Sequence, residues 1–330
     1  MTGASGHLGN VVCRKLLEQD YLVRAMVHTD RRSLQGLDAG NERSRTMELV
    51  EGDILNLNDV NNLLKGCEAV IHCAGIISIH GDPDGRVLKT NTEGPHHVVE
   101  AAKNAGVKRI IHVSSVHAVR EIPHHLPFNE SRPYKTAQDP VYDFSKASGE
   151  QIFLKGCADS NTELIILRPS SIVGPFDFKP SLLGAALLDF YHQKIPFLPQ
   201  GGYDFVDVRD VAQAAVNAIH LGKHGEVYNL SGTYYTFKKF ARVIQKVTGK
   251  KVPQRVIPYK LLRAILPLVS LYARWTKTLP AITRESIDAV YLGHPQMDHA
   301  KAKKDLHFSC RALEESLHDY YSWQKEQGKI

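Results

Sequence analysis

The feature that most constrains the fold is a run of glycines at the start of the chain. Residues 2–9 read Thr-Gly-Ala-Ser-Gly-His-Leu-Gly, and a helical pattern follows them. In such a turn Gly3 permits the tight bend, Gly6 lets a pyrophosphate approach the backbone, and Gly9 lets the helix lie close to a sheet. The residues expected to hold a phosphate-bearing ligand are Gly3, Ser5, Gly6, His7 and Leu8.

The first half of the chain alternates short apolar runs with helical patterns. The apolar runs are 21–27, 69–72, 109–114 and 163–167, and the helical patterns are 9–18, 58–64, 94–105 and 144–157. This alternation is typical of βαβ units. We therefore predict an α/β fold over residues 1–175, with a doubly wound parallel sheet of the Rossmann type.

The character of the sequence changes from about Phe176. Prolines become frequent, and the strand–helix alternation persists only near 205–208 and 226–230. We predict that residues 176–330 form mainly a smaller, mixed lobe that binds substrate, with some segments returning to the sheet.

Composition and charge argue against several classes of protein. An apolar content of 43% is ordinary for a globular chain. The net charge of +6 comes from basic residues spread along the chain, so no nucleic-acid partner is expected. The 5 cysteines form no CxxC pair, which favours a reducing cytoplasm. No metal site is expected, because neighbouring histidines point apart on a helix or strand.

No stretch reaches the ~18 uninterrupted apolar residues of a membrane span. The nearest candidate runs from Leu261 to Trp275 and is interrupted by Arg263, Pro267 and Arg274. A helix packed on its own domain is favoured, and peripheral association with a membrane is the alternative.

A glycine turn of this kind normally follows a buried strand, yet only Met1 precedes Thr2. That strand would lie between the strands at 21–27 and 69–72, whose backbone groups it would pair. We therefore expect the natural protein to begin a few residues earlier, with an apolar stretch ahead of Met1.

Two further segments support a dinucleotide ligand. Residues 50–54 end a short strand with a carboxylate, which can accept a hydrogen bond from an adenine amino group. Residues 69–75 form an apolar strand that ends in small residues, where a flat cofactor can lie against the backbone. The expected contacts in these segments are Asp53, Ile54, Ala74 and Gly75.

The choice of cofactor depends on the residues that follow the strand ending at Val27. NAD-binding proteins carry an acidic side chain at this position, which here is apolar. His28, Arg31 and Arg32 lie just beyond it, and a guanidinium group matches a phosphate with two hydrogen bonds. NADP(H) is therefore preferred. In the alternative, Asp30 serves the ribose and NAD(H) is bound.

A tyrosine and a lysine stand at the centre of the expected chemistry. Tyr142 and Lys146 are four residues apart and share one face of a helix. A phenol with a reference pKa of ~10 needs a nearby cation to exchange protons near neutral pH. The strand end at Ser114–Ser115 brings a hydroxyl toward the substrate oxygen, and Asn91 could fix a bridging water or the adjacent backbone.

With these segments in this order, the chain resembles an extended short-chain dehydrogenase/reductase, similar to the dihydroflavonol reductase, 3β-hydroxysteroid dehydrogenase and NAD-dependent epimerase/dehydratase group. The resemblance covers nearly the whole chain and includes Arg168-Pro169 through Gly174-Pro175 and the stretch 206–211. It implies that Ser115 carries the catalytic hydroxyl and that Pro169 to Ile172 pass beside the nicotinamide. It also implies that Tyr142 exchanges a proton with a carbonyl or alcohol oxygen while the nicotinamide exchanges a hydride at the carbon, with Lys146 lowering the pKa of the phenol.

The same resemblance leaves the substrate open. Nucleotide-sugar epimerases commonly hold the diphosphate with an arginine where this chain has Tyr203, ahead of Asp204-Phe205. A phenol favours a less charged small molecule, such as a hydrophobic or aromatic hydroxy-ketone or a sterol-like substrate. The expected substrate contacts are Ile76, His117, Phe176 and Tyr203.

Two alternative functions remain, and the oligomeric state is open as well. An epimerase or dehydratase that retains NAD could use Arg168 or Arg209 for the diphosphate. A non-catalytic NAD(P)-sensing protein is a minor alternative, because such proteins usually lack the Tyr–Lys pair. A homodimer is possible from family habit alone.

Overall fold

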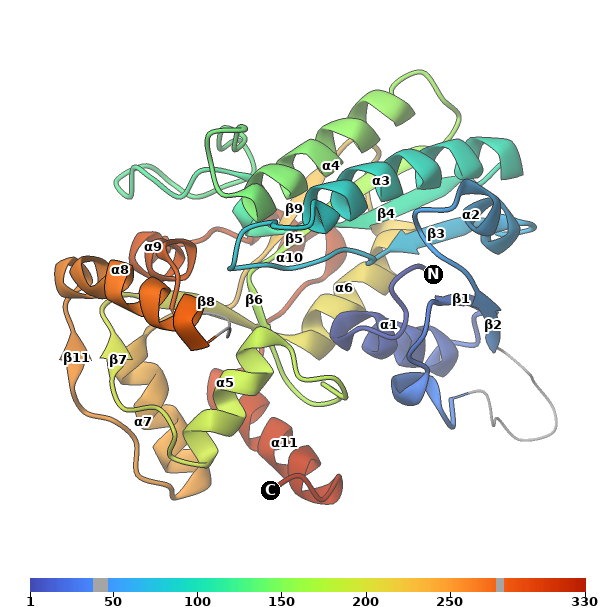
Figure 1. Cartoon of the computed structure of the whole chain (residues 1–330). Helices are drawn as coiled ribbons and strands as arrows, with labels where there is room; N and C mark the ends of the chain where they lie inside the picture. Colours follow the sequence, from blue (N-terminus) through green and yellow to red (C-terminus); the bar gives the residue numbers. More distant parts are fainter. Residues whose placement is uncertain (38–46, 277–281) are drawn as a thin grey trace.

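The computed structural model describes residues 1–37, 47–276 and 282–330, without the side chains of Ser270, Tyr272 and Arg274. Arg274, one of the predicted interruptions of the apolar stretch, therefore lies outside the described side chains. A parallel sheet lies between two layers of helices, and a smaller group of strands and helices adjoins it (Figure 1). The predicted α/β fold of the Rossmann type is confirmed.

The main sheet is parallel throughout the described residues. Its hydrogen-bonded strands, in spatial order, are β3 (Ala69–His72), β4 (Arg109–Val113), β5 (Glu163–Pro169) and β9 (Val227–Leu230). Beside β3 lies a parallel pair made of β1 (Val23–Val27) and β2 (Met47–Glu51).

The first two residues of the chain connect this pair to the main sheet. The carbonyl oxygen of Met1 accepts a hydrogen bond of 2.9 Å from the backbone of Met26 in β1. Thr2 donates to the carbonyl of Ile71 at 3.1 Å, and its own carbonyl accepts from Cys73 at 3.2 Å. Met1 and Thr2 thus occupy the place of a strand between β1 and β3. The expected stretch ahead of Met1 stays a prediction.

Helices cover both faces of the sheet, and each face has its own hydrophobic core. One face carries α2 (Leu57–Leu64), α3 (Arg86–Ala105) and α4 (Val141–Cys157), and the other carries α1 (His7–Glu18), α6 (Val208–Leu221) and α10 (Ala300–Leu306). Successive strand residues point to opposite faces. Accordingly, Ile110 of β4 belongs to the core beneath α3, whereas Ile111 belongs to the core beneath α1.

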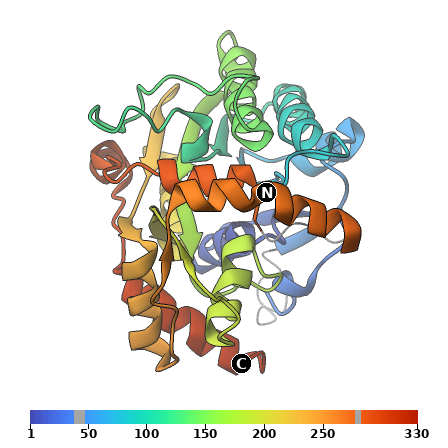
Figure 2. The same cartoon turned by 60° about the vertical axis from the view of Figure 1, so that its left-hand side comes forward.

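The remaining elements gather at the carboxyl ends of the main strands (Figure 2). Their strands are β6 (Ser171–Val173), β7 (Leu198–Pro199), β8 (Gly202–Asp207), β10 (Thr233–Thr236) and β11 (Val256–Ile257). Their helices are α5 (Leu182–Tyr191), α7 (Phe237–Thr248), α8 (Tyr259–Thr276), α9 (Arg284–Leu292) and α11 (Leu313–Glu326). An aromatic core that includes Phe190, Phe205 and Phe240 holds much of this part together. From the second half of the chain, β9, α6 and α10 join the main sheet and its helices. The proposed boundary near residue 175 stays a prediction.

Helix α8 carries the apolar stretch singled out in the sequence. It lies against α9 and buries Leu262 and Ala273, while Leu268 is 68% exposed. Among the described residues no helix is both long and apolar enough to cross a membrane.

Candidate active site

The glycine turn leads from Thr2 into α1 and has the close contacts that the sequence predicts. Gly3 adopts a φ of +65°, and a Cβ there would come within 2.6 Å of the backbone nitrogen of Ala74. A Cβ at Gly6 would meet only the carbonyl oxygen of Gly3, at 3.3 Å, so the backbone at Gly6 is open to a ligand. Helix α1 has no acidic residue in its first turn. This arrangement fits a pyrophosphate at the amino end of a helix.

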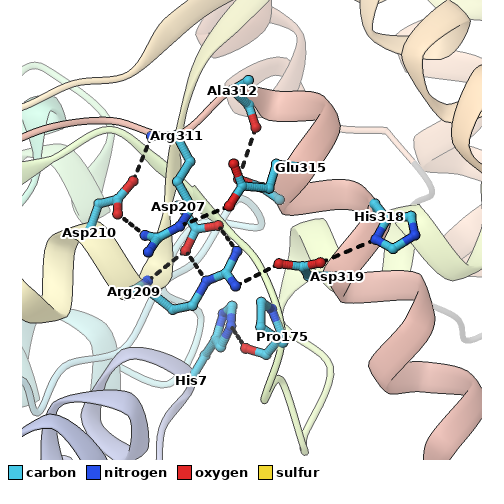
Figure 3. Close-up of polar contacts among 11 residues, drawn as sticks. His7, Pro175, Asp207, Arg209, Asp210, Arg311, Ala312, Glu315, His318 and Asp319 are labelled. Atoms are coloured by element: carbon cyan, nitrogen blue, oxygen red, sulfur yellow. Dashed lines mark hydrogen bonds and ion pairs between the residues drawn. The ribbon is translucent and has the colours of Figure 1, made fainter.

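A buried asparagine, which the sequence analysis overlooked, holds the turn in place. The side-chain amide of Asn10 donates to the carbonyl oxygens of Gly6 and His7, both at 2.9 Å, and to that of Phe176 at 3.1 Å. The His7 ring lies 3.0 Å from the carbonyl oxygen of Pro175 (Figure 3). Asn10 is fully buried, and the signal in the sequence was a polar residue directly ahead of the apolar run Val11-Val12-Cys13.

Phe176, expected to contact the substrate, lies beside the glycine turn. Its backbone has a φ of +69°, and its ring lies under the guanidinium of Arg14, 4.6 Å from the ring centroid. The cation–π contact and the hydrogen bond from Asn10 both direct Phe176 toward α1.

The two arginines expected to bind a 2′-phosphate lie at the exposed end of β1, and each contacts a carboxylate. Arg31 donates to Glu51 at 2.8 Å, and Arg32 donates to Asp30 at 2.6 Å. The hydrogen bonds from Arg32 lower the pKa of Asp30 to about 2. These pairs are exposed, so each contributes little to stability.

The residues predicted to lie near an adenine follow the end of β2. The Asp53 carboxylate accepts a hydrogen bond from the backbone of Leu55 at 2.9 Å and lies 4.0 Å from the His28 ring. Ile54 is buried, and its carbonyl lies 2.9 Å from the His97 ring. Asp53 and His28 remain exposed at the edge where β1 and β2 end.

Asn91 in α3 fixes the segment that follows β3. Its side-chain oxygen accepts from the backbone of Ile76 at 2.9 Å, and its amide donates to the Ile76 carbonyl at 3.0 Å. The same amide donates to the hydroxyl of Ser145 at 2.9 Å, and that hydroxyl donates to the Tyr142 carbonyl at 2.7 Å. A Cβ on Gly75 would come within 3.0 Å of the Asn91 oxygen, so a larger residue would crowd the site.

Tyr142 and Lys146 lie in the first two turns of α4, and Ser115 follows the end of β4. The Ser115 hydroxyl lies near enough to the Tyr142 phenol to lower its pKa. Its pKa is raised to about 12 by burial, which outweighs the lowering effect of Ser115. The Ser114 hydroxyl is buried and has no hydrogen-bond partner within the described part of the chain. The geometry therefore favours Ser115 over Ser114 as the hydroxyl beside the tyrosine.

The ammonium of Lys146 points to the main sheet. It is 8% exposed, and its Nζ donates to the carbonyl oxygen of Val113 at 3.0 Å. Burial lowers the pKa of Lys146 to about 8, against the opposing effect of Glu150. The sequence analysis expected Lys146 to lower the pKa of Tyr142. In this structure burial has the largest effect on the pKa of Tyr142 and raises it, while the ammonium of Lys146 donates to the carbonyl oxygen of Val113.

A cavity lies between the segment after Ser115, strand β8 and helix α9. His117 and Tyr203, two of the predicted substrate contacts, line it together with the apolar side chains of Val116 and Met297. Ile76 and Phe176 are not among its lining residues. Pro169 and Ile172, expected beside the nicotinamide, lie at the end of β5 and in β6, on either side of two residues that line the cavity, Ser170 and Ser171.

A cluster of charges beside the cavity had no counterpart in the sequence analysis. His117 Nδ1 lies 3.5 Å from a carboxylate oxygen of Glu121 and 3.7 Å from one of Asp143. The ammonium of Lys135 contacts both carboxylates, at 2.7 and 3.0 Å. His117, Glu121 and Asp143 have the spacing of metal ligands, but Lys135 already supplies a cation to both acids. No motif links these positions, so only the fold identifies them as neighbours.

The two arginines considered for a substrate diphosphate are held by carboxylates. Arg168 forms a two-pronged pair with Glu150, at 2.8 and 2.6 Å, with both side chains at most 1% exposed. Arg209 donates to Asp207 at 2.9 Å and to Asp319 at 2.6 Å (Figure 3). Figure 3 places the guanidinium of Arg209 between those two carboxylates.

Comparison with known proteins decides the family. The profile of a family described as "NAD dependent epimerase/dehydratase family" matches residues 1–231. The chain belongs to this family. It is an NAD(P)-dependent oxidoreductase of the extended short-chain dehydrogenase/reductase type.

Members of the family with similar sequences cover the whole chain. Sterol demethylase protein B of Methylococcus capsulatus is 30% identical over 338 residues, which span 100% of this chain and 99% of that protein. A putative dihydroflavonol 4-reductase of Synechocystis is 27% identical over 344 residues, which span 100% of this chain and 95% of that protein. The crystal structure of gox2253 superposes with a TM-score of 0.85 at 30% identity and covers 100% of this chain and 98% of its own.

Proposed function

We propose that this family member catalyses the NADP(H)-dependent interconversion of a carbonyl and an alcohol on a small, mainly hydrophobic or aromatic hydroxy-ketone or sterol-like substrate. The observation that carries this proposal is that the Tyr142 phenol, the Ser115 hydroxyl and the buried ammonium of Lys146 are neighbours at one place in the fold. These three groups lie where the carboxyl end of β4 meets the amino end of α4.

The bound nicotinamide supplies or accepts the hydride, and the chain's own groups handle the proton. Tyr142 donates its phenolic proton to the carbonyl oxygen during reduction. The raised pKa of about 12 keeps this phenol protonated at neutral pH, so it starts each reduction as an acid. Ser115 donates a hydrogen bond to the same oxygen, and Lys146 holds the nicotinamide ribose. Asn91 positions the backbone of Ile76 and, through Ser145, the start of α4.

The glycine turn fits the cofactor's pyrophosphate, and the end of β1 fits a 2′-phosphate. Arg31 and Arg32 are exposed and paired with single carboxylates. Exposed pairs of this kind are weak, so both guanidinium groups can exchange a carboxylate for a dianionic phosphate. We therefore propose NADP(H) as the preferred cofactor, with NAD(H) as the alternative.

Three observations support an uncharged substrate. Tyr203 lines the cavity at the position where a diphosphate-binding arginine is expected, and apolar residues from several elements line it too. Arg168 and Arg209 are already paired with carboxylates. Two relatives are named for a sterol and for a dihydroflavonol, both ring compounds of largely apolar surface.

A cofactor assay with two kinds of substrate tests the proposal. The purified protein is given NADPH or NADH with apolar hydroxy-ketones, and separately NAD⁺ with UDP-glucose. We expect oxidation of NADPH by the ketones and no epimerised sugar. Conversion of UDP-glucose to its 4-epimer, with tightly retained NAD⁺ and no ketone reduction, would replace the reductase by an epimerase. A protein that binds NADP(H) but turns over neither substrate would favour the sensing alternative.

A further inference from the structure

Resting on the proposed function, we propose that His117 determines substrate specificity by donating a hydrogen bond from Nε2 to a second oxygen of the substrate. The enzyme would then select ketones that carry another oxygen near the carbonyl that is reduced. No sequence motif or family match assigns this role to His117.

The first step is the orientation of the imidazole. Its Nδ1 lies 3.5 Å from Glu121 and 3.7 Å from Asp143, so this nitrogen carries a proton that faces two carboxylates. The opposite nitrogen, Nε2, has no hydrogen bond to any described residue. Because His117 lines the cavity, Nε2 is the ring nitrogen left available to a ligand.

The second step is the charge of the cluster. Glu121 and Asp143 have side chains only 11% and 12% exposed, and Lys135 neutralises one of these two buried negative charges. A protonated His117 neutralises the other, so the four groups together carry no net charge. Burial alone would raise the pKa of Glu121, but the hydrogen bond to His117 and the charge of Lys135 bring it down to about 2. Burial likewise opposes the charged form of His117, but the carboxylates outweigh it and raise its pKa.

The third step is the distance between His117 and Tyr142, the proposed proton donor. The ring centroids of His117 and Tyr142 are 6.2 Å apart, so the imidazole lies within reach of a second oxygen a few atoms from a carbonyl that meets Tyr142. Tyr203 lines the same cavity from β8, and its hydroxyl has no hydrogen bond to any described residue. Besides Glu121, the acid of the lining is Asp204, whose carboxylate accepts from the backbone of Gly232 at 2.7 Å. Among the described lining groups, His117 is thus the one held in a charged donor form by its neighbours.

The pH dependence follows from the direction in which the pKa of His117 moves. The protonated ring is present below its folded-state pKa and is lost as the pH rises through that value, which lies above the usual 6.5. Preference for a second, hydrogen-bond-accepting oxygen should therefore be strong at pH 6 and decline as the solution becomes alkaline.

The test compares a methyl ketone with the 2,3-dione of the same chain length. The measured quantity is the ratio of kcat/KM for the dione to that for the ketone, from pH 6 to 9, in wild type and His117→Gln. Taking the ratio cancels the titration of groups that serve both substrates. In wild type we expect the ratio to fall about tenfold or more as the pH rises. In the variant the ratio should be lower at pH 6 and independent of pH, because an amide does not titrate.

Two controls keep the outcome decisive. His96→Gln changes an exposed histidine of α3, far along the helix from the cavity, and should leave the wild-type ratio and its pH dependence intact. Calorimetric affinities of both ketones for the NADP⁺-loaded enzyme give the same ratio without turnover. Absence of all ketone reduction would contradict the proposed function, whereas the ratio of affinities would still decide the role of His117. A ratio that does not change with pH in wild type, or that is the same in His117→Gln, would overturn this inference.

Discussion

Lys146 donates a hydrogen bond of 3.0 Å to the backbone carbonyl of Val113, which joins the start of α4 to the carboxyl end of β4. This contact holds the ammonium beside Gly75, where a Cβ would lie 3.9 Å from its Nζ. A flat cofactor that passes over Gly75 would therefore meet a fixed cation, and the cation's position does not depend on the substrate.

Replacing this lysine should affect both the binding of cofactor and the chemistry. For Lys146→Met we expect weaker NADPH binding and a lower kcat, since the ammonium would hold the nicotinamide ribose in position for the reaction beside Tyr142. In wild type the ammonium loses its proton as the pH rises through about 8, so kcat/KM should fall above that pH. Fluorescence titration with NADPH and a pH–rate profile measure the two effects. Lys155→Met, an exposed change on the same helix, is the control, and an equal response from both variants would contradict the role.

The arginines at the end of β1 should decide between the two cofactors. Arg31→Ala combined with Arg32→Ala should weaken NADPH binding by about tenfold or more and NADH binding much less, because only NADPH has the 2′-phosphate. Glu51→Gln removes the partner of Arg31 and should tighten NADPH binding. Dissociation constants for both cofactors measure this, with the exposed Arg242→Ala as control. Equal losses for NADPH and NADH would mean that neither arginine touches the 2′-phosphate.

Two buried histidines should make the fold sensitive to acid. His72 and His112 stack at 5.4 Å between neighbouring strands, and both ring nitrogens of His112 lack a partner among the described residues. Burial lowers the pKa of His72 to about 3 and that of His112 well below 6.5. The unfolded chain therefore binds protons more readily than the folded chain. The contribution of the two neutral histidines to the free energy of unfolding is complete above about pH 6.5 and is lost as the pH falls toward 3.

Urea unfolding at pH 7 and pH 5 measures that loss. We expect the free energy of unfolding of His112→Leu to depend less on pH than that of wild type. A tenfold difference in proton affinity between the folded and the unfolded chain corresponds to about 1.4 kcal/mol, so the effect is within reach of the measurement. At pH 7 the variant should be close to wild type, because it removes two unpaired nitrogens along with the ring's packing. If the free energy of unfolding of His112→Leu fell between pH 7 and pH 5 by as much as that of wild type, the buried His112 would not be a cause of the acid sensitivity.

The buried pair of Arg168 and Glu150 joins β5 to α4, the helix that carries Tyr142 and Lys146. Glu150→Gln leaves the guanidinium of Arg168 without its charge partner, at a cost of about 3–5 kcal/mol in the free energy of unfolding. Glu314→Gln removes the partner of Lys246 in an exposed pair and should cost at most about 1 kcal/mol. Thermal or urea unfolding compares the two, and similar small losses would show that the buried pair is not needed for stability.

Much of the fold could be predicted because its signals are local. The glycine spacing, each apolar run and the Tyr142–Lys146 spacing involve residues that are close in the sequence. The structure has a turn into a helix at the glycines, strands at the apolar runs, and Tyr142 and Lys146 on one helix. The boundary of α3 was less predictable: the helix begins at Arg86, well before the predicted start at Gly94, since only Val87 and Leu88 are apolar in this first part of the helix.

The remaining features depend on contacts between distant parts of the chain. Asn10 meets Phe176 only because β6 leads back to the glycine turn, and this contact moves the Phe176 ring away from the cavity. The cluster of His117, Glu121 and Lys135 likewise arises from a loop that folds back across α4. The sequence predicted His117 as a substrate contact, which stays a prediction, and gave no reason for its charge.

The central claim is that Tyr142 is the proton donor, and one comparison of wild type with Tyr142→Phe tests it most directly. The control is Tyr291→Phe, which changes an exposed tyrosine of α9. Steady-state reduction of a ketone and direct titration with NADPH are measured for all three proteins. The account predicts that Tyr142→Phe loses about a hundredfold or more in kcat while its dissociation constant for NADPH stays within about twofold of wild type. Near-normal kcat in Tyr142→Phe would contradict it.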